Sequence, residues 1–288
     1  MKIKSMNFAG AWYPGDGESC RAQIQTFLDG MDELDAAPHM AGIVPHAGWV
    51  YSGSIACRVL AHLAVGPGKD ADTVILFGGH LGPDSPSFFL GQGGVETPLG
   101  NIEVDEELGR ALKARLAASG DDIHSLSPGR FPDDNTLELQ YPFIKFLFPN
   151  AKILPVGIAP PLARGAGEAV VDIAKDLGRE IRVVGSTDMS HYGPQFGMTS
   201  AGSGRTALDW VVNTNDAAGL DAMGSMDEEQ IISQGLALRN LCCPGAAGAA
   251  ASAAKKMGAA KGTCLDYATS YSEDDPAHFV GYGGILYS

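Results

Sequence analysis

The sequence has little of several features that mark specialised classes of protein. Lys and Arg supply only 20 of its 288 residues, against 34 Asp and Glu, so the formal charge is −14. This charge opposes binding to phosphate backbones, and no basic run forms an extended nucleic-acid surface. No apolar run reaches about 18 residues, and the N-terminus lacks the apolar segment of a signal peptide. We therefore expect no membrane span and a cytoplasmic protein.

Cysteine and glycine motifs exclude further classes. The five cysteines are odd in number and include no CxxC pair, so we expect reduced thiols rather than a disulfide framework. Cys20, Cys57 and Cys264 lie in apolar or amphipathic stretches and are expected to be buried. Neither a GxGxxG fingerprint after a strand nor a GxxxxGK[ST] loop occurs, so dinucleotide and P-loop chemistry are unsupported.

What the sequence does contain is an alternation of short apolar runs and helix-like segments. With 45% apolar residues, 38 glycines and no linker, it predicts one α/β domain over residues 1–288. Its central sheet should be mostly parallel or mixed and flanked by helices. Strands are expected near residues 40–44, 73–77, 153–158, 182–184, 264–271 and 279–286. Helices are expected near residues 54–65, 105–118, 137–148, 167–177, 227–241 and 245–257.

Three of the first four predicted strands end beside a side chain that can bind metal or move protons. These side chains are His46, His80 and Asp188. In open α/β sheets, loops from separate strands converge at the carboxyl ends, so the three could meet in space. His191 follows Asp188 by three residues, and we expect a short helical turn to bring both onto one face. For each residue alone, an ordinary turn or surface role is the alternative.

Two adjacent cysteines, Cys242 and Cys243, follow a predicted helix and precede a Pro-Gly turn that opens an Ala-rich helix. Backbone N–H groups at a helix N-terminus lower the pKa of a thiol, so a thiolate here could bind metal. The pattern does not decide which of the two side chains faces inward. A buried structural thiol is the alternative for either.

Taken together, several motifs resemble the Memo family and occur in the family's order from about residue 9 to residue 285. They are AGAWYPGD, PHAGWVYSG, the Gly-Gly-His80 unit, NTLELQYPF, STDMSHYG, LCCPGA and VGYGGI. The resemblance implies the fold of the class III extradiol dioxygenases and a protein of the type called AmmeMemoRadiSam system protein B. It also implies a radical-SAM protein and an AMMECR-domain protein as partners, but no substrate.

The resemblance further implies a metal site formed by His46, His80 and Cys242, with Asp188 and His191 lining the same pocket. Two imidazoles and a thiolate around a divalent ion are similar to the facial triad of non-haem iron oxygenases. We expect Fe(II), and the softer thiolate also allows copper or zinc.

The chain departs from the family pattern at two places. Asn135 and Thr136 stand where the family commonly has His-Ser, ahead of the matching Glu138, and Cys243 replaces a usual Gly. Asn cannot titrate as His does, so a proton relay at that position is in doubt.

Two functions from different classes, and a third related to the first, are compatible with these residues. In an oxygenase-like enzyme, His191 would act as general acid/base, Asp188 would orient it, and Glu138 would support the site. In a binding or adaptor protein, four aromatic residues would form an apolar surface that recognises the partner. In an enzyme the same residues would exclude water, and the alternative for all four is a place in the hydrophobic core. They are Trp12, Tyr13, Trp49 and Tyr51. A zinc hydrolase using Asp188 or His191 as base ranks third.

Overall fold

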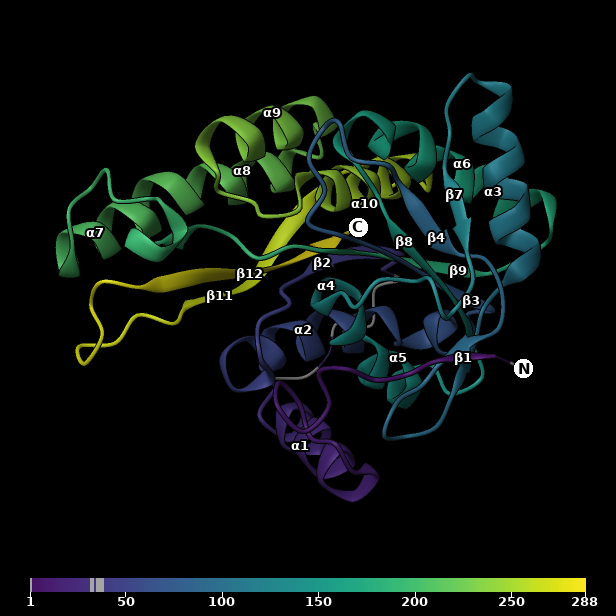
Figure 1. Ribbon diagram of the computed structural model, residues 1–288, viewed down its shortest axis with the longest axis horizontal. Helices are drawn as coiled ribbons and strands as arrows, with labels where there is room; N and C mark the ends of the chain where they lie inside the picture. Colours follow the sequence, from purple (N-terminus) through teal and green to yellow (C-terminus); the bar gives the residue numbers. More distant parts are fainter. Residues whose placement is uncertain (1, 32–33, 35–38) are drawn as a thin grey trace.

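A computed structural model of the protein describes residues 2–31, 34 and 39–288, and in these residues a nine-stranded mixed sheet runs through the molecule (Figure 1). The strand order is β10-β12-β2-β9-β3-β8-β4-β7, and β11 pairs with β12. The four central strands are parallel: β2 (Ala41–Val44), β9 (Ile181–Ser186), β3 (Thr73–Gly78) and β8 (Lys152–Gly157). The outer strands are β10 (His191–Tyr192), β12 (Phe279–Tyr287), β11 (Gly262–Thr269), β4 (Phe88–Leu90) and β7 (His124–Leu126).

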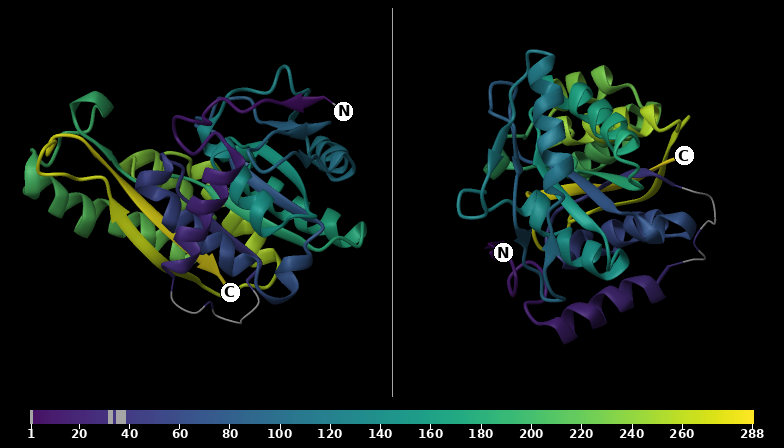
Figure 2. Two further views of the ribbon diagram at one scale, coloured as in Figure 1. Left: turned by 90° about the horizontal axis from the view of Figure 1, so that it is seen from below. Right: turned by 90° about the vertical axis from the view of Figure 1, so that its right-hand side faces the viewer.

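Helices cover both faces of this sheet (Figures 1 and 2). One face carries α10 (Pro244–Lys256), α6 (Ala163–Asp176), α3 (Glu106–Ala118), α8 (Ala217–Ser225) and α9 (Glu228–Leu238). The other carries α2 (Trp49–Leu63), α5 (Tyr141–Leu147), α4 (Asn135–Glu138) and α1 (Gly17–Asp29). The central strands are therefore buried on both sides, as their unbroken apolar sequences require.

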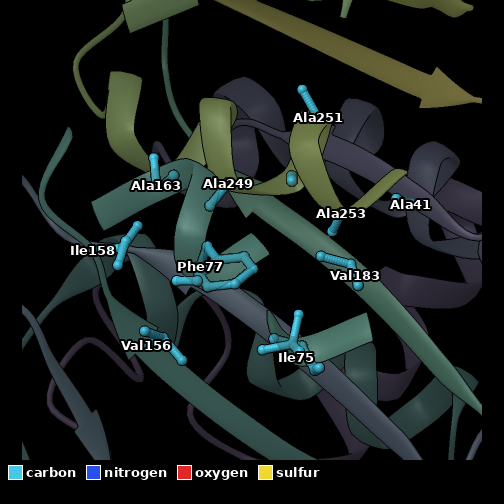
Figure 3. Close-up of a cluster of buried hydrophobic side chains, with 14 of the residues drawn as sticks. Ala41, Ile75, Phe77, Val156, Ile158, Ala163, Val183, Ala249, Ala251 and Ala253 are labelled. Atoms are coloured by element: carbon cyan, nitrogen blue, oxygen red, sulfur yellow. The ribbon is translucent and has the colours of Figure 1, made fainter. Parts of the chain in front are cut away.

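The alternation of side chains along β3 explains how one strand serves two cores. Ile75 and Phe77 pack under α10 and α6, whereas Val74 and Leu76 pack under α2 and α5. Figure 3 shows the first of these cores, where alanines of α10 face Phe77 and Val183.

The remaining elements lie outside this three-layer arrangement. The helix α7 (Gly204–Trp210) continues through the π-helical stretch η4 (Val211–Asp216) into α8. The short strands β1 (Ile3–Lys4), β5 (Gly94–Val95) and β6 (Ile102–Glu103) form a separate small sheet. Short 3-10 turns occur at Gly66–Asp70, Pro160–Leu162 and Pro194–Phe196.

The predicted fold class and the positions of the main strands are confirmed. The helix expected near residues 105–118 is α3, and Asp105 caps it, because its side chain accepts a hydrogen bond from the backbone N–H of Leu108. Among the residues that the structure describes, no helix is long and apolar enough to cross a membrane.

Four local predictions were wrong. The helix expected at 137–148 is broken into α4 and α5, because Pro142 near the start of α5 has no N–H to continue the first helix. The helix α2 begins at Trp49 rather than at residue 54. The segment from Asp188 to His191 is not helical, and His191 opens β10 instead. Cys264 is exposed rather than buried.

Candidate metal centre

The first histidine of the site lies just beyond the carboxyl end of β2. The backbone N–H of His46 donates a hydrogen bond to Asp188 Oδ1 at 2.7 Å, and its Nδ1 lies 3.0 Å from Ser186 Oγ. Both partners come from the end of the neighbouring strand β9, and the ring is buried. The contact at Nδ1 fixes the ring so that Nε2 points toward the other site residues.

The second histidine follows β3, on the other side of β9. Gly79 has a φ of +94°, a conformation that favours glycine, and its N–H donates to Thr136 Oγ1 at 2.7 Å. This turn places the ring of His80 with its centroid 5.1 Å from that of His46. Unlike His46, His80 is exposed to solvent.

Cys242 reaches the histidines from the loop between α9 and α10. Its Sγ accepts a hydrogen bond from the N–H of Asp188 at 3.2 Å and lies 3.2 Å from His46 Nε2. Its own N–H donates to the carbonyl of Asp188, and the N–H of Cys243 donates to Thr187 Oγ1. The end of β9 therefore holds the backbone of both cysteines.

These residues form a compact group of metal-binding type. One ligand atom from each of His46, His80, Cys242 and Cys243 lies within 4.8 Å of all the others. The two sulfur atoms are 3.7 Å apart. Cys242 is half-buried and lines the adjoining pocket, whereas Cys243 is buried. Both thiols thus face the group, an arrangement that the sequence pattern left undecided.

Asp188 and His191 lie beside this group. Asp188 Oδ2 is 3.8 Å from His46 Nε2 and 3.9 Å from His191 Nε2. Among the described residues, His191 Nε2 finds no hydrogen-bond partner although it is buried. Although the segment between them is not helical, the two side chains remain neighbours. His191 lines the pocket beside the group, whereas Asp188 is buried behind it.

The ionisable side chains of the group shift one another's pKa values. Burial opposes ionisation of Cys242, but the Cys243 thiol and the ring of His46 hold the pKa of Cys242 well below its usual range. Burial would lower the pKa of His46, yet the charges of Asp188 and Cys242 raise it to about 9. Burial raises the pKa of Asp188. The thiolate at the centre therefore attracts a cation.

A pocket of about 380 Å³ opens next to this group and is lined by His80, His191, Phe196, Arg239 and Cys242 among others. Phe196 also lines a second groove of about 530 Å³. Its aromatic wall includes two of the predicted recognition residues, Trp12 and Tyr51, which are 41% and 57% exposed.

The other predicted residues lie in the supporting structure. Tyr13 and Trp49 are buried, and Tyr13 donates a hydrogen bond to Glu138. Glu138 also accepts from the N–H groups of residues 7 and 8, so it fixes the N-terminal loop. Asn135 donates its Nδ2 hydrogen bond to the carbonyl of His46 and thereby helps to hold the first turn.

Sequence reasoning missed a buried amide network behind the site. Asn215 Nδ2 donates to Ser190 Oγ at 2.7 Å, and Asn240 Nδ2 donates to the carbonyl of Asn215 at 2.9 Å. The network ties the Cys242 loop to the His191 segment. No local pattern marks these residues, because their partners are 25 positions away in the chain.

Comparison with known proteins agrees with this arrangement of motifs. Residues 4–286 match the family described as Memo-like protein. The chain therefore belongs to the Memo family. It is 30% identical over 297 residues to a MEMO1 family protein of Methanopyrus kandleri, covering 99% of this chain and 98% of that protein. It is also 30% identical over 295 residues to a MEMO1 family protein of Pyrococcus furiosus, with 99% and 98% covered.

Likeness in structure is weaker. A crystal structure of an uncharacterized protein of Escherichia coli aligns with a TM-score of 0.49 and 10% identity, covering 80% of this chain and 91% of that one. The expected likeness to the class III extradiol dioxygenases stays a prediction.

Proposed function

We propose that this Memo protein is a metal-dependent redox enzyme of oxygenase-like type, with His46, His80 and Cys242 as the ligands of one divalent ion. The observation that carries the proposal is the group of nitrogen and sulfur atoms within 4.8 Å of one another. The histidines follow β2 and β3, on either side of β9, and the cysteines lie in the loop before α10. Fe(II) is the ion that we place first, with copper and zinc as alternatives.

The donor set fits such an ion on grounds of chemistry and charge. A buried thiolate and two imidazoles are common ligands of iron, copper and zinc. The half-buried Cys242 has a lowered pKa, and the negative charge of its thiolate would be balanced by a bound divalent ion. The contact between His46 Nδ1 and Ser186 Oγ leaves Nε2 free for the ion.

The remaining residues would handle protons and position the substrate. When bound, the ion would supply electron transfer and polarise a substrate oxygen. His191 Nε2, which makes no hydrogen bond with the described residues, is free to take a proton from substrate or give one to it. Asp188 lies 3.9 Å from that nitrogen and would stabilise its protonated form. Phe196 and Met198 would exclude water from the pocket.

The deciding experiment measures metal content and oxygen uptake of anaerobically purified protein. We expect near-stoichiometric metal, predominantly iron, in the wild type and its loss in Cys242→Ala and His80→Ala. His124→Ala, which changes an exposed histidine outside the site, is the matched control and should retain full metal. Full metal retention in both site variants would refute the ligand assignment. Metal without any metal-dependent oxygen uptake would refute the oxygenase-like activity.

The aromatic groove favours a second candidate function, that of a protein that binds a peptide or partner. Trp12, Tyr51 and the 79% exposed Val50 line a groove that meets the metal pocket at Phe196. Exposed aromatic side chains of this kind are typical of recognition surfaces. Partner binding that survives removal of the metal but is lost in Trp12→Ala would favour this candidate over the enzyme.

The partners that we propose are a radical-SAM protein and an AMMECR-domain protein, on the basis of the family resemblance alone. We also propose that the protein is located in the cytoplasm, where its five free cysteines would stay reduced. Copurification of the tagged chain with both partners after coexpression tests the association, and recovery of neither would contradict it.

A further inference from the structure

We propose that Cys243 is a second sulfur ligand of the same ion, so that the centre has two imidazoles and two thiolates. This inference rests on the metal centre proposed above and extends it by one ligand. By the resemblance described above, Gly commonly stands at this position in the family, so a second sulfur ligand would be particular to chains with Cys here.

The distance between the two sulfur atoms fits a shared ion. Thiolates that bind one tetrahedral ion at about 2.3 Å lie roughly 3.8 Å apart. The sulfur atoms of Cys242 and Cys243 are 3.7 Å apart, and both lie within 4.8 Å of a ring nitrogen of each of His46 and His80. Little movement of the side chains is therefore needed for all four to bind one ion.

The backbone holds the second thiol in this position. The N–H of Cys243 donates to Thr187 Oγ1 at 3.0 Å, and Cys243 is the N-cap residue of α10. This helix is 13 residues long, and its dipole favours negative charge at this end. Burial and the neighbouring sulfur of Cys242 nevertheless raise the pKa of the Cys243 thiol, so a bound ion would have to displace its proton. Cys243 is only 1% exposed, so contact with solvent does not explain its orientation.

A second sulfur changes which ion the centre prefers. Two thiolates and two imidazoles in tetrahedral array are typical of zinc, and thiolates also favour Cu(I). Among the three candidate ions, a Cys243 ligand would therefore strengthen the binding of zinc and cuprous copper more than that of Fe(II). It also occupies the fourth position of a tetrahedral ion, so a substrate would bind only at a fifth position or after one ligand leaves.

Cobalt(II) is the probe that counts the sulfur ligands, because its near-ultraviolet charge-transfer absorption rises with each bound thiolate. We would load metal-free protein with cobalt under anaerobic conditions and compare wild type with Cys242→Ala, Cys243→Ala, Cys243→Ser and the double variant. Each single variant should lose about half of the absorption per bound cobalt, and the double variant all of it. Cys57→Ala, which removes a buried thiol in α2, is the matched control and should change nothing.

Zinc affinity gives a second readout on the same proteins. Loss of groups that merely support a ligand already weakens metal binding by about 10- to 100-fold, so Cys243→Ala should weaken zinc at least about tenfold in a chelator competition. X-ray absorption of the zinc-loaded wild type needs no variant and should show two sulfur neighbours per ion.

The outcomes separate this inference from the proposal on which it rests. Complete loss of the cobalt absorption in Cys242→Ala, with no change in either Cys243 variant and one sulfur neighbour in the wild type, would refute the role of Cys243 and leave the three-ligand centre intact. Failure of the wild type to bind cobalt or zinc stoichiometrically would refute the centre itself. If Cys243→Ala does not fold, the nearly isosteric Cys243→Ser and the X-ray absorption spectrum of the zinc-loaded wild type still show whether Cys243 binds the ion.

Discussion

On the α10 face of the sheet the helix backbone lies almost against the strands, whereas on the α2 face large aromatic side chains fill the space. A Cβ added at Gly185 of β9 would lie 2.7 Å from Ala246 O and 2.8 Å from Ala250 Cβ. On the opposite face, the rings of Trp49 and Phe143 stack at 4.1 Å between centroids.

This difference in packing matches the roles of the two faces. Close approach of α10 brings its N-terminus, and with it Cys242 and Cys243, to the end of β9. The α2 face buries large aromatic side chains and so contributes hydrophobic stabilisation. It also contains a buried hydrogen bond, from Trp49 Nε1 to the carbonyl of Leu139. We conclude that the α10 face determines the geometry of the candidate metal centre and the α2 face mainly determines the stability of the domain.

The largest effect on stability is expected from Phe143→Ala. Phe143 is fully buried, and truncation of such a side chain costs about 3–5 kcal/mol of the free energy of unfolding. Because the loss falls on the α2 face, the folded variant should bind cobalt with the stoichiometry of the wild type. Urea unfolding of metal-free protein and cobalt titration measure the two quantities. A small loss of stability accompanied by loss of the metal would contradict the comparison.

A smaller cost in stability but a larger effect on metal is expected from Ala250→Leu. No space exists between Ala250 and Gly185, so the added atoms must push α10 away from β9 at a cost of about 1–3 kcal/mol. Because Cys243 moves with the helix, zinc affinity should fall at the same time. Lys255→Leu adds a leucine at an exposed position of α10 and is the control. Unchanged zinc affinity in Ala250→Leu would show that the centre tolerates displacement of the helix.

The smallest expected effect on stability comes from Asp216, a buried carboxyl group in η4, beyond the edge of the α10 face. Burial raises the pKa of Asp216, although Ser190 N–H and Tyr267 Oη donate hydrogen bonds to its oxygens. The folded state then binds more protons than the unfolded state, so this group lowers the free energy of unfolding as pH rises above 3.8. Asp216→Asn removes that decline.

The stability of Asp216→Asn relative to wild type should therefore increase as pH rises from about 4 toward neutrality. Urea unfolding at several pH values measures this trend, and Asp221→Asn, exposed on α8, serves as the control. Parallel curves for Asp216→Asn and wild type would show that burial of this carboxyl group has no energetic consequence.

The sheet could be predicted because its central strands are short and buried on both faces. Such strands appear in the sequence as short, unbroken apolar runs, which can be recognised without knowledge of their neighbours in space. Helix boundaries were less predictable. The helix α2 begins five residues before the predicted start and includes Gly53, which is buried against Phe27, whose ring leaves no space for a side chain there. The π-helical stretch η4 has no sequence signature, and its residues Asn215 and Asp216 form hydrogen bonds with Ser190, about 25 positions away.

For the candidate site, the sequence by itself identified the candidate ligand residues and the strand ends that carry the histidines. His46, His80 and Asp188 each follow an apolar run, and parallel strands bring such ends to one edge of a sheet. Only the tertiary structure decided that both cysteines face the histidines and that Glu138 holds the N-terminal loop instead. Side-chain direction there depends on contacts with Thr187 and residues 7 and 8, which are more than 50 positions away, and no local pattern encodes a contact at that separation.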